Sequence, residues 1–126
     1  MTELLNAAKQ ARLNAYTPYS QFKVGAAVKT HNGLIFAGCN IENASYGLTV
    51  CAERVAIFAA LTAGCSNIVE LAVVADTELP VTPCGACRQV MQEFGIQTVY
   101  MSNLNNDISK MCMQDLLPHA FNLTQK

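Results

Sequence analysis

The spacing of apolar and polar positions changes several times along the chain, and each change predicts the start of a new element. Apolar residues at helical spacing predict helices, and short continuous apolar runs predict strands. Helices are predicted over residues 2–15, 51–63, 84–94 and 113–117, and strands over residues 22–30, 34–39, 68–75, 97–101 and 108–112. Thr2 is expected to cap the first helix. Asn32-Gly33 predicts a hairpin turn between the first two strands, since such turns need positive φ angles.

Two of the predicted elements are apolar on nearly all sides, which is typical of the interior of a fold. Residues 51–63 predict such a helix, ended by Gly64, and the apolar run 68–75 predicts a central strand. Residues 40–50 show no clear period and are expected to form a loop with functional side chains. The order of elements predicts one α/β domain, residues 1–126, with a central mixed five-stranded sheet in a three-layer α-β-α sandwich.

The composition of the chain limits the kinds of molecule that the protein is expected to bind. Charged residues make up only 13% of the chain against 52% apolar residues, so we expect apolar surface to be buried between subunits. A formal net charge of −1 and the lack of a basic run argue against nucleic acid, and no apolar run reaches membrane-spanning length. Residues 1–16 do not have the pattern of a signal peptide. A chain with six cysteines therefore fits a reducing cytoplasm and metal binding better than a set of disulfides in a secreted protein.

Three cysteines stand where two of the predicted helices begin. They belong to the runs Cys51-Ala52-Glu53-Arg54 and Pro83-Cys84-Gly85-Ala86-Cys87. Cys84 and Cys87, three residues apart, share one face of a first helical turn. Free backbone N–H groups and the positive end of the helix dipole favour thiolates there, and thiolates are ligands that suit zinc. Three protein ligands leave one coordination position open, which is typical of a catalytic zinc site.

Glu53 follows the first of these cysteines by two residues and is expected beside the metal. A carboxylate in this place can accept a proton from a metal-bound water and pass it on, as a general acid–base catalyst does. Arg54 lies at i+3 from Cys51, so its guanidinium can donate hydrogen bonds to that thiolate. We therefore expect Glu53 to be catalytic and Arg54 to support Cys51.

Other interpretations stay open at the level of the sequence. A fourth cysteine, Cys39, would turn the cluster into a structural zinc site, and Cys84-x-x-Cys87 alone matches a redox pair. Glu53 also fits an exposed charge at a helix start, and Arg54 fits a surface residue. Neither histidine is assigned to zinc. The cysteines outside the cluster are expected in the core, namely Cys39, Cys65 and Cys112.

Taken together, the motifs resemble the small, homotetrameric, zinc-dependent cytidine deaminases of the cytidine and deoxycytidylate deaminase superfamily. The resemblance extends through nearly the whole chain. It is carried by Phe22-Lys23-Val24-Gly25-Ala26-Ala27, Asn40-Ile41-Glu42-Asn43-Ala44-Ser45-Tyr46-Gly47, Cys51-Ala52-Glu53-Arg54, Thr82-Pro83-Cys84-Gly85-Ala86-Cys87-Arg88-Gln89, Leu116-Leu117-Pro118 and Phe121. A ligand-x-Glu run followed by Pro-Cys-x-x-Cys is the signature of the zinc nucleobase deaminases.

This resemblance implies one zinc ion per subunit, a nucleoside substrate and a homotetramer in the cytoplasm. It implies that Phe22 packs on the pyrimidine ring, that Asn40 and Glu42 bind ribose hydroxyls, and that Ala52 contacts the substrate. For two further aromatic residues it implies contacts between subunits near the site, namely Tyr46 and Phe121. From the residues alone, these aromatic side chains are also compatible with core packing, and polar residues in a loop need no special role.

The expected function is zinc-dependent hydrolytic deamination of cytidine and deoxycytidine to uridine and deoxyuridine, with release of ammonia, in pyrimidine salvage. In the implied mechanism Glu53 takes a proton from the water that attacks C4, and passes it to N3 and to the leaving amine. One alternative is a deaminase of a cytosine-containing antibiotic, as in blasticidin-S deaminases. An alternative from another class is a structural zinc module without turnover.

Overall fold

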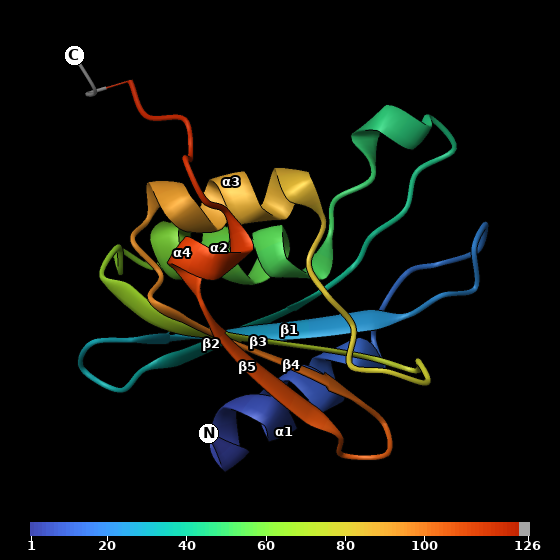
Figure 1. The fold of residues 1–126 in the computed structure, drawn as a ribbon. Coiled ribbons are helices and arrows are strands. Elements are labelled where there is room, and N and C mark those ends of the chain that lie inside the picture. Colours follow the sequence, from blue (N-terminus) through green and yellow to red (C-terminus); the bar gives the residue numbers. More distant parts are fainter. Residues whose placement is uncertain (124–126) are drawn as a thin grey trace.

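The computed structural model describes residues 1–123, and the statements below refer to this range. The helices are α1 (Thr2–Arg12), α2 (Ala52–Thr62), α3 (Gly85–Glu93) and α4 (Met113–Leu116), and the strands are β1 (Val24–Thr30), β2 (Ile35–Cys39), β3 (Ile68–Ala75), β4 (Thr98–Asn103) and β5 (Ile108–Cys112) (Figure 1). A short 3-10 helix, η1 (Tyr46–Leu48), lies in the long loop between β2 and α2. No helix in this range has the length and apolar character that crossing a membrane requires.

The strands form one mixed sheet in the order β2-β1-β3-β4-β5. β3 and β4 pair in parallel, and the other neighbouring strands pair antiparallel. Because β3 and β4 run in the same direction, their last residues, Ala75 and Asn103, are partners at one end of the sheet. The predicted mixed five-stranded sheet, with residues 68–75 as its central strand, is confirmed.

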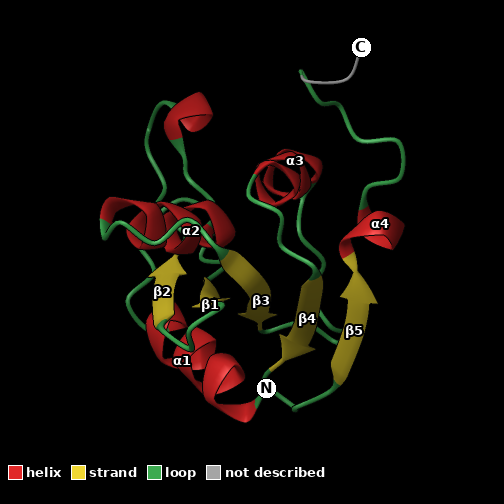
Figure 2. Cartoon of the chain, turned by 90° about the vertical axis from the view of Figure 1, so that its left-hand side faces the viewer, coloured by secondary structure: helices red, strands yellow, loops and turns green. Residues whose placement is uncertain are grey.

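Helices cover both faces of this sheet (Figure 2). On one face α1 packs through Leu4, Leu5 and Ala8, which lie on the apolar side that its sequence pattern predicts. On the other face α2, α3 and α4 share a larger core that includes Ile57 and Met91. The predicted three-layer α-β-α sandwich is therefore confirmed.

Two glycines let helices approach the sheet closely, one on each face. A Cβ atom on Gly25 in β1 would lie 1.9 Å from the carbonyl oxygen of Ala8 in α1. A Cβ atom on Gly38 in β2 would lie 2.5 Å from the backbone nitrogen of Ala56 in α2. Neither distance leaves room for a side chain, so the spacing of both helix layers depends on glycine at these positions.

The first helix and the first strand differ in extent from the prediction. α1 ends at Arg12 instead of residue 15, and its N-cap is Met1, so Thr2 lies inside the helix and does not cap it. β1 begins two residues later than predicted. At Phe22 and Val24 the backbone forms hydrogen bonds with the side chain of Asn40 and not with the backbone of β2. The Asn40 Oδ1 accepts from the Val24 N–H at 2.9 Å, and its Nδ2 donates to the Phe22 carbonyl at 2.8 Å.

The three cysteines outside the predicted metal cluster are less buried than expected. Cys39 and Cys65 are half-buried, and Cys112 is exposed, which corrects its predicted place in the core. Burial alternates along the edge strand β5, and Cys112 falls on the exposed phase at its last position. Its thiol donates instead to Asp115 at 3.2 Å.

Candidate active site

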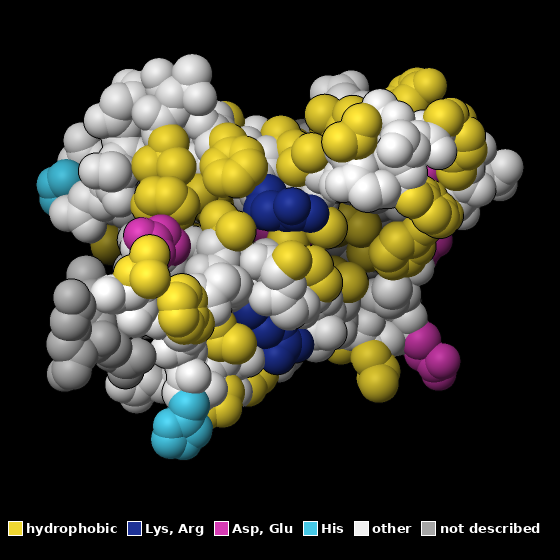
Figure 3. Space-filling model, turned by 90° about the horizontal axis from the view of Figure 1, so that it is seen from above, with side chains coloured by type: hydrophobic (Ala, Val, Ile, Leu, Met, Phe, Trp, Pro, Cys, Tyr) yellow, Lys and Arg dark blue, Asp and Glu magenta, His cyan; other side chains and the backbone are white. Residues whose placement is uncertain are grey.

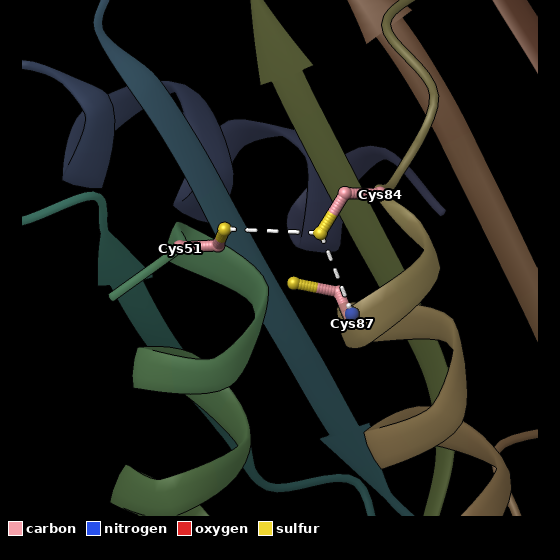
Figure 4. A group of neighbouring side chains, drawn as sticks. All are labelled: Cys51, Cys84 and Cys87. Carbon is pink, nitrogen blue, oxygen red and sulfur yellow. Dashed lines mark hydrogen bonds between the residues drawn. The ribbon is translucent and has the colours of Figure 1, made fainter. Parts of the chain in front are cut away.

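The three predicted ligands come together between the starts of α2 and α3 (Figure 4). Their Sγ atoms all lie within 4.8 Å of one another. Cys51 is the N-cap of α2 and Cys84 is the N-cap of α3, and Cys87 follows on the first turn of α3. The Cys84 Sγ accepts the backbone N–H of Cys87 at 3.5 Å, the contact that a Ser or Asp cap makes in other helices. Two helix starts thus point their sulfur atoms at one place.

The surroundings of these sulfur atoms favour a thiolate at Cys51. Hydrogen bonding with the Cys87 thiol is the main cause that lowers the pKa of Cys51 to about 5, against the opposing effect of burial. The same hydrogen bond, together with burial, raises the pKa of Cys87. Within residues 1–123 no carboxylate or histidine joins the three sulfur atoms as a further ligand. A donor set of three sulfurs fits zinc and leaves a coordination position free.

Glu53 lies on the first turn of α2, beside the thiols, and only 4% of its surface is exposed. Burial raises the pKa of its carboxyl to about 7, and the negative charge of Cys51 acts in the same direction. Acidic side chains are rarely buried so completely without a partner or a task, and a perturbed pKa in a cavity is typical of functional groups. The interpretation of Glu53 as an exposed charge at a helix start is therefore wrong.

Arg54 is half-buried on the side of α2 that carries Cys51. Its Nη2 donates to the Cys51 Sγ at 3.5 Å, and this hydrogen bond is the main cause that raises the pKa of the guanidinium. Its Nε is buried and has no hydrogen-bond partner among the described residues. The side chain is thus held at the sulfur cluster, as the spacing in the sequence predicts.

A cavity of about 220 Å³ opens beside the cluster. Its lining comes from five segments of the chain and consists of Phe22, Val24, Asn40, Thr49, Cys51, Ala52, Glu53, Val73, Val81, Thr82 and Cys84. Small-molecule sites usually have volumes of roughly 300–1,000 Å³, so this cavity suits a small ligand. A larger hollow of about 580 Å³ lies beside α1 and β2, but the sulfur cluster and the buried carboxylate belong to the smaller cavity.

Three of the predicted substrate residues, Phe22, Asn40 and Ala52, line this cavity. Phe22 is 41% exposed, so its interpretation as a core residue is wrong. Asn40 holds the chain on both sides of Lys23 through the hydrogen bonds described above, and it thereby places Phe22 at the cavity wall. The structure brings these three residues together with Glu53.

Glu42, the fourth predicted substrate residue, is buried but does not line the cavity. Its Oε1 accepts the backbone N–H groups of Tyr19 and Ser20 at 3.0 and 3.1 Å, and its Oε2 accepts the Ser20 hydroxyl. The Ser20 hydroxyl is the main cause that lowers the pKa of the Glu42 carboxyl. In this structure Glu42 therefore holds the loop that leads to Phe22.

Tyr46 and Phe121 lie at the surface and are not part of the cavity wall. Their exposed fractions are 72% and 67%, which overturns their interpretation as core residues. The backbone oxygen of Phe121 accepts a hydrogen bond from Gln89 Nε2 at 3.1 Å, so the C-terminal segment is tied to α3.

Five lining residues are absent from the predicted site, namely Val24, Thr49, Val73, Val81 and Thr82. Val24 stands in the motif that begins at Phe22. Thr82 adjoins Pro83 in one of the motifs, which was the available signal in the sequence. The others are ordinary residues of a strand or a loop. Apolar patterning shows that such residues are present but not which of them face a cavity.

Comparison with known proteins places this site in a family. A family model described as the cytidine and deoxycytidylate deaminase zinc-binding region matches residues 1–103. The chain belongs to the cytidine and deoxycytidylate deaminase family. Because the model describes a zinc-binding region and the cluster of Cys51, Cys84 and Cys87 fits a zinc ion, this deaminase-family protein has zinc as its cofactor, one ion per subunit.

Relatives of this deaminase-family protein match it along most of its length. It is 53% identical to the cytidine deaminase of Sporosarcina psychrophila, over 94% of this chain and 89% of that protein. It is 54% identical to the cytidine deaminase of Halalkalibacterium halodurans, over 94% of this chain and 91% of that protein. The crystal structure of the Burkholderia pseudomallei cytidine deaminase superposes with a TM-score of 0.92 at 52% identity, covering 95% of this chain and 98% of that chain.

Replacing Cys39 with Ser is expected to leave both zinc content and turnover unchanged. Cys39 ends β2 and is not among the residues that gather at the cluster. The measurement is zinc per chain and deaminase activity of the purified variant, with Cys87→Ser as the matched change inside the cluster. Loss of zinc in the Cys39 variant would restore the structural four-cysteine site as an explanation.

Proposed function

We propose that this protein is a cytidine deaminase that converts cytidine and deoxycytidine to uridine and deoxyuridine with release of ammonia. The observation that carries the proposal is the buried carboxylate of Glu53 between three thiols and a small cavity. The similarity to proteins named cytidine deaminase over nearly the whole chain supports the choice of substrate. We include the entire chain, residues 1–126, in one catalytic domain.

The chemistry divides between the metal and Glu53. Zinc bound by Cys51, Cys84 and Cys87 supplies a Lewis acid that lowers the pKa of water. Glu53 accepts the proton of the water that adds to C4 of the pyrimidine, delivers it to N3, and then assists departure of the amine as ammonia. Water and cytidine are consumed and uridine and ammonia are formed, so Glu53 ends in its starting protonation state. Its burial keeps bulk water from competing for this proton.

The cavity lining suits a pyrimidine nucleoside, and we assign Phe22 to packing on the ring, Ala52 to contact with the base, and Asn40 to a ribose hydroxyl. Glu42 does not line the cavity, and we assign it to a ribose hydroxyl on the similarity of the chain to cytidine deaminases. Asn40 uses one of its two amide hydrogens on the Phe22 carbonyl, which leaves the other available. The Oε2 of Glu42 has a lone pair beyond the one that accepts from Ser20. Both side chains can therefore hold the chain and the sugar at once.

Replacing Arg54 with Gln is expected to lower turnover by about 10–100-fold, the usual effect of removing a partner of a metal ligand. The guanidinium donates to the Cys51 Sγ, and three thiolates without such a donor would weaken the Lewis acidity of the metal. Turnover and zinc content of the variant are the measurements. Wild-type turnover in Arg54→Gln would show that this hydrogen bond does not support the chemistry.

The assembly we propose is a homotetramer in the cytoplasm that serves pyrimidine salvage. Large hydrophobic side chains are exposed on the long loop, on α2 and on the C-terminal segment, including Tyr46, Leu48, Phe58 and Phe121. Hydrophobic side chains are spread over the face that carries α2, α3 and η1, with few charged ones between them (Figure 3). Surfaces of this kind are usually covered by a partner. All six cysteines are free, as a reducing compartment would keep them.

Replacing Phe121 with Ala is expected to raise the KM for cytidine or to shift the tetramer toward smaller species, because we place this side chain at a neighbouring subunit's site. Sedimentation at micromolar concentration and steady-state kinetics measure the two effects. Leu13→Ala removes a similarly exposed apolar side chain at the end of α1 and serves as the control. Normal kinetics together with normal assembly would remove Phe121 from the site, and a monomeric wild type would contradict the tetramer.

One experiment tests the function itself. The purified protein is incubated with cytidine, the formation of uridine and ammonia is followed, and zinc per chain is measured. We expect one ammonia per uridine and turnover that chelation of zinc abolishes. Zinc without turnover would instead favour a structural zinc module. The antibiotic deaminase is not favoured by the relatives, and turnover of a cytosine-containing antibiotic but not of cytidine would reverse that choice.

A further inference from the structure

Asn103, the last residue of β4, is fully buried although its side chain is polar. It lies opposite Ala75, where β3 and β4 end side by side and the chain leaves both strands at the same end of the sheet (Figure 1). After β3 comes the loop of residues 76–84, which has no regular secondary structure and leads to the start of α3. After β4 comes the turn to β5.

The side chain of Asn103 binds both of these segments. Its Oδ1 accepts the backbone N–H groups of Asn105 and Asp107, each at 3.0 Å, which closes the turn to β5. Its Nδ2 donates to Asp107 Oδ2 at 2.9 Å and to the backbone carbonyl of Glu78 at 3.0 Å. The first three bonds lie within the turn, whereas the bond to Glu78 is not needed to form the turn and reaches the loop after β3.

That loop forms one wall of the cavity. Val81, Thr82 and Cys84 all line it, and Cys84 is a member of the sulfur cluster. The loop is fastened to the end of β4 by the Asn103–Glu78 bond and by the Val81 N–H, which donates to the Ser102 carbonyl at 3.3 Å. A segment without its own secondary structure keeps a fixed position only through such anchors.

We propose that Asn103 is a positioning residue, which holds the Glu78 carbonyl and thereby fixes Val81, Thr82 and Cys84 at the cavity wall. The inference rests on the proposed function for its kinetic consequence, but its structural part stands on the hydrogen bonds alone. Misplacement of catalytic or binding groups by about 1 Å can cost about 100-fold in rate, so an anchor three residues away from the wall matters for the reaction.

A double replacement separates the two tasks of Asn103. In Asn103→Asp combined with Asp107→Asn, a carboxylate oxygen still accepts the two turn N–H groups, and the new amide at position 107 donates to the other oxygen. The donor to the Glu78 carbonyl is lost, and a carboxylate oxygen that repels this carbonyl takes its place. Asp107→Asn alone keeps that donor and is the matched control. The N–H groups from which the introduced carboxylate accepts favour its ionised form against the effect of burial, and assays at pH 8 favour that form further.

We expect the double variant to have a KM for cytidine at least about fivefold above that of the Asp107→Asn control, with zinc content unchanged. A purely structural role would lower the melting temperature without this rise in KM. A KM equal to that of the control in a folded double variant would overturn the proposal.

Hydrogen exchange in the wild-type protein gives a second measurement that does not depend on the variants folding or on activity. The Val81 amide donates to the Ser102 carbonyl, and it should be protected to a similar degree as those of Asn105 and Asp107, because the Asn103 side chain binds both segments and makes them open together. Exchange of the Val81 amide at the rate of an unstructured loop would overturn the proposal. Absence of cytidine turnover in the wild type would instead count against the proposed function and leave this test intact.

Discussion

Replacing Glu53 with Gln is expected to lower the turnover of cytidine by about three powers of ten or more, while the fold and the zinc content remain. Gln has nearly the shape of Glu, so the packing of this buried side chain is kept. An amide cannot accept and return a proton at neutral pH, and only the proton transfer is therefore removed. Single-turnover kinetics and zinc per chain measure the two halves of the expectation.

A matched control for this change is Glu93→Gln, at the exposed end of α3. It alters charge by the same amount without touching the cavity, and wild-type turnover is expected. Substrate binding to the Glu53 variant should persist, since the ring and ribose contacts are untouched. If the Glu53 variant retained turnover within tenfold of the wild type, Glu53 would not be the proton carrier.

Replacing Gly25 with Ala is expected to destabilise the fold by about 3 kcal/mol, at the upper end of the usual effect of overpacking. The added methyl group would overlap the carbonyl oxygen of Ala8, and it would also lie 2.7 Å from the backbone nitrogen of Arg12. Backbone atoms of a helix cannot turn aside as a side chain can, so α1 has to move off the sheet. Thermal unfolding should show a loss on the order of 10 °C in Tm.

Gly47→Ala is the control, because a Cβ atom there meets nothing within 4 Å. Its effect on the free energy of unfolding should stay within about 0.5 kcal/mol, as is usual for surface changes. An equally stable Gly25 variant would mean that α1 is not held at the distance the structure shows.

The order of elements and the sulfur cluster could be predicted from the sequence because both depend on local patterns. Apolar periodicity marks a buried face wherever it lies, and Cys84 and Cys87 are brought together by the helical turn itself. No local pattern shows that Cys51 lies beside them, because Cys51 begins α2 whereas Cys84 and Cys87 begin α3. The family motifs supplied that link, and the structure brings the three sulfur atoms together.

The failures of prediction concern side chains whose partners are distant in sequence. Nothing near Thr2 shows that Met1 takes the cap, and nothing near Cys112 shows that the edge strand turns it outward. No role is predicted for Asn103, because its bond to Glu78 spans 25 positions. Hydrogen bonds of that kind follow from the fold and leave no local pattern.

The three thiols lie on the same face of the sheet because of the handedness of the connection between β3 and β4. Two parallel strands, β3 and β4, are joined through α3, and such crossovers are right-handed in about 98% of cases. The hand of the crossover decides which face of the sheet α3 covers, and here it is the face of α2. With the opposite hand, α3 would carry Cys84 and Cys87 to the side of α1, and the sheet itself would stand between them and Cys51. The three cysteines can therefore meet only because L-amino acids favour the right-handed crossover.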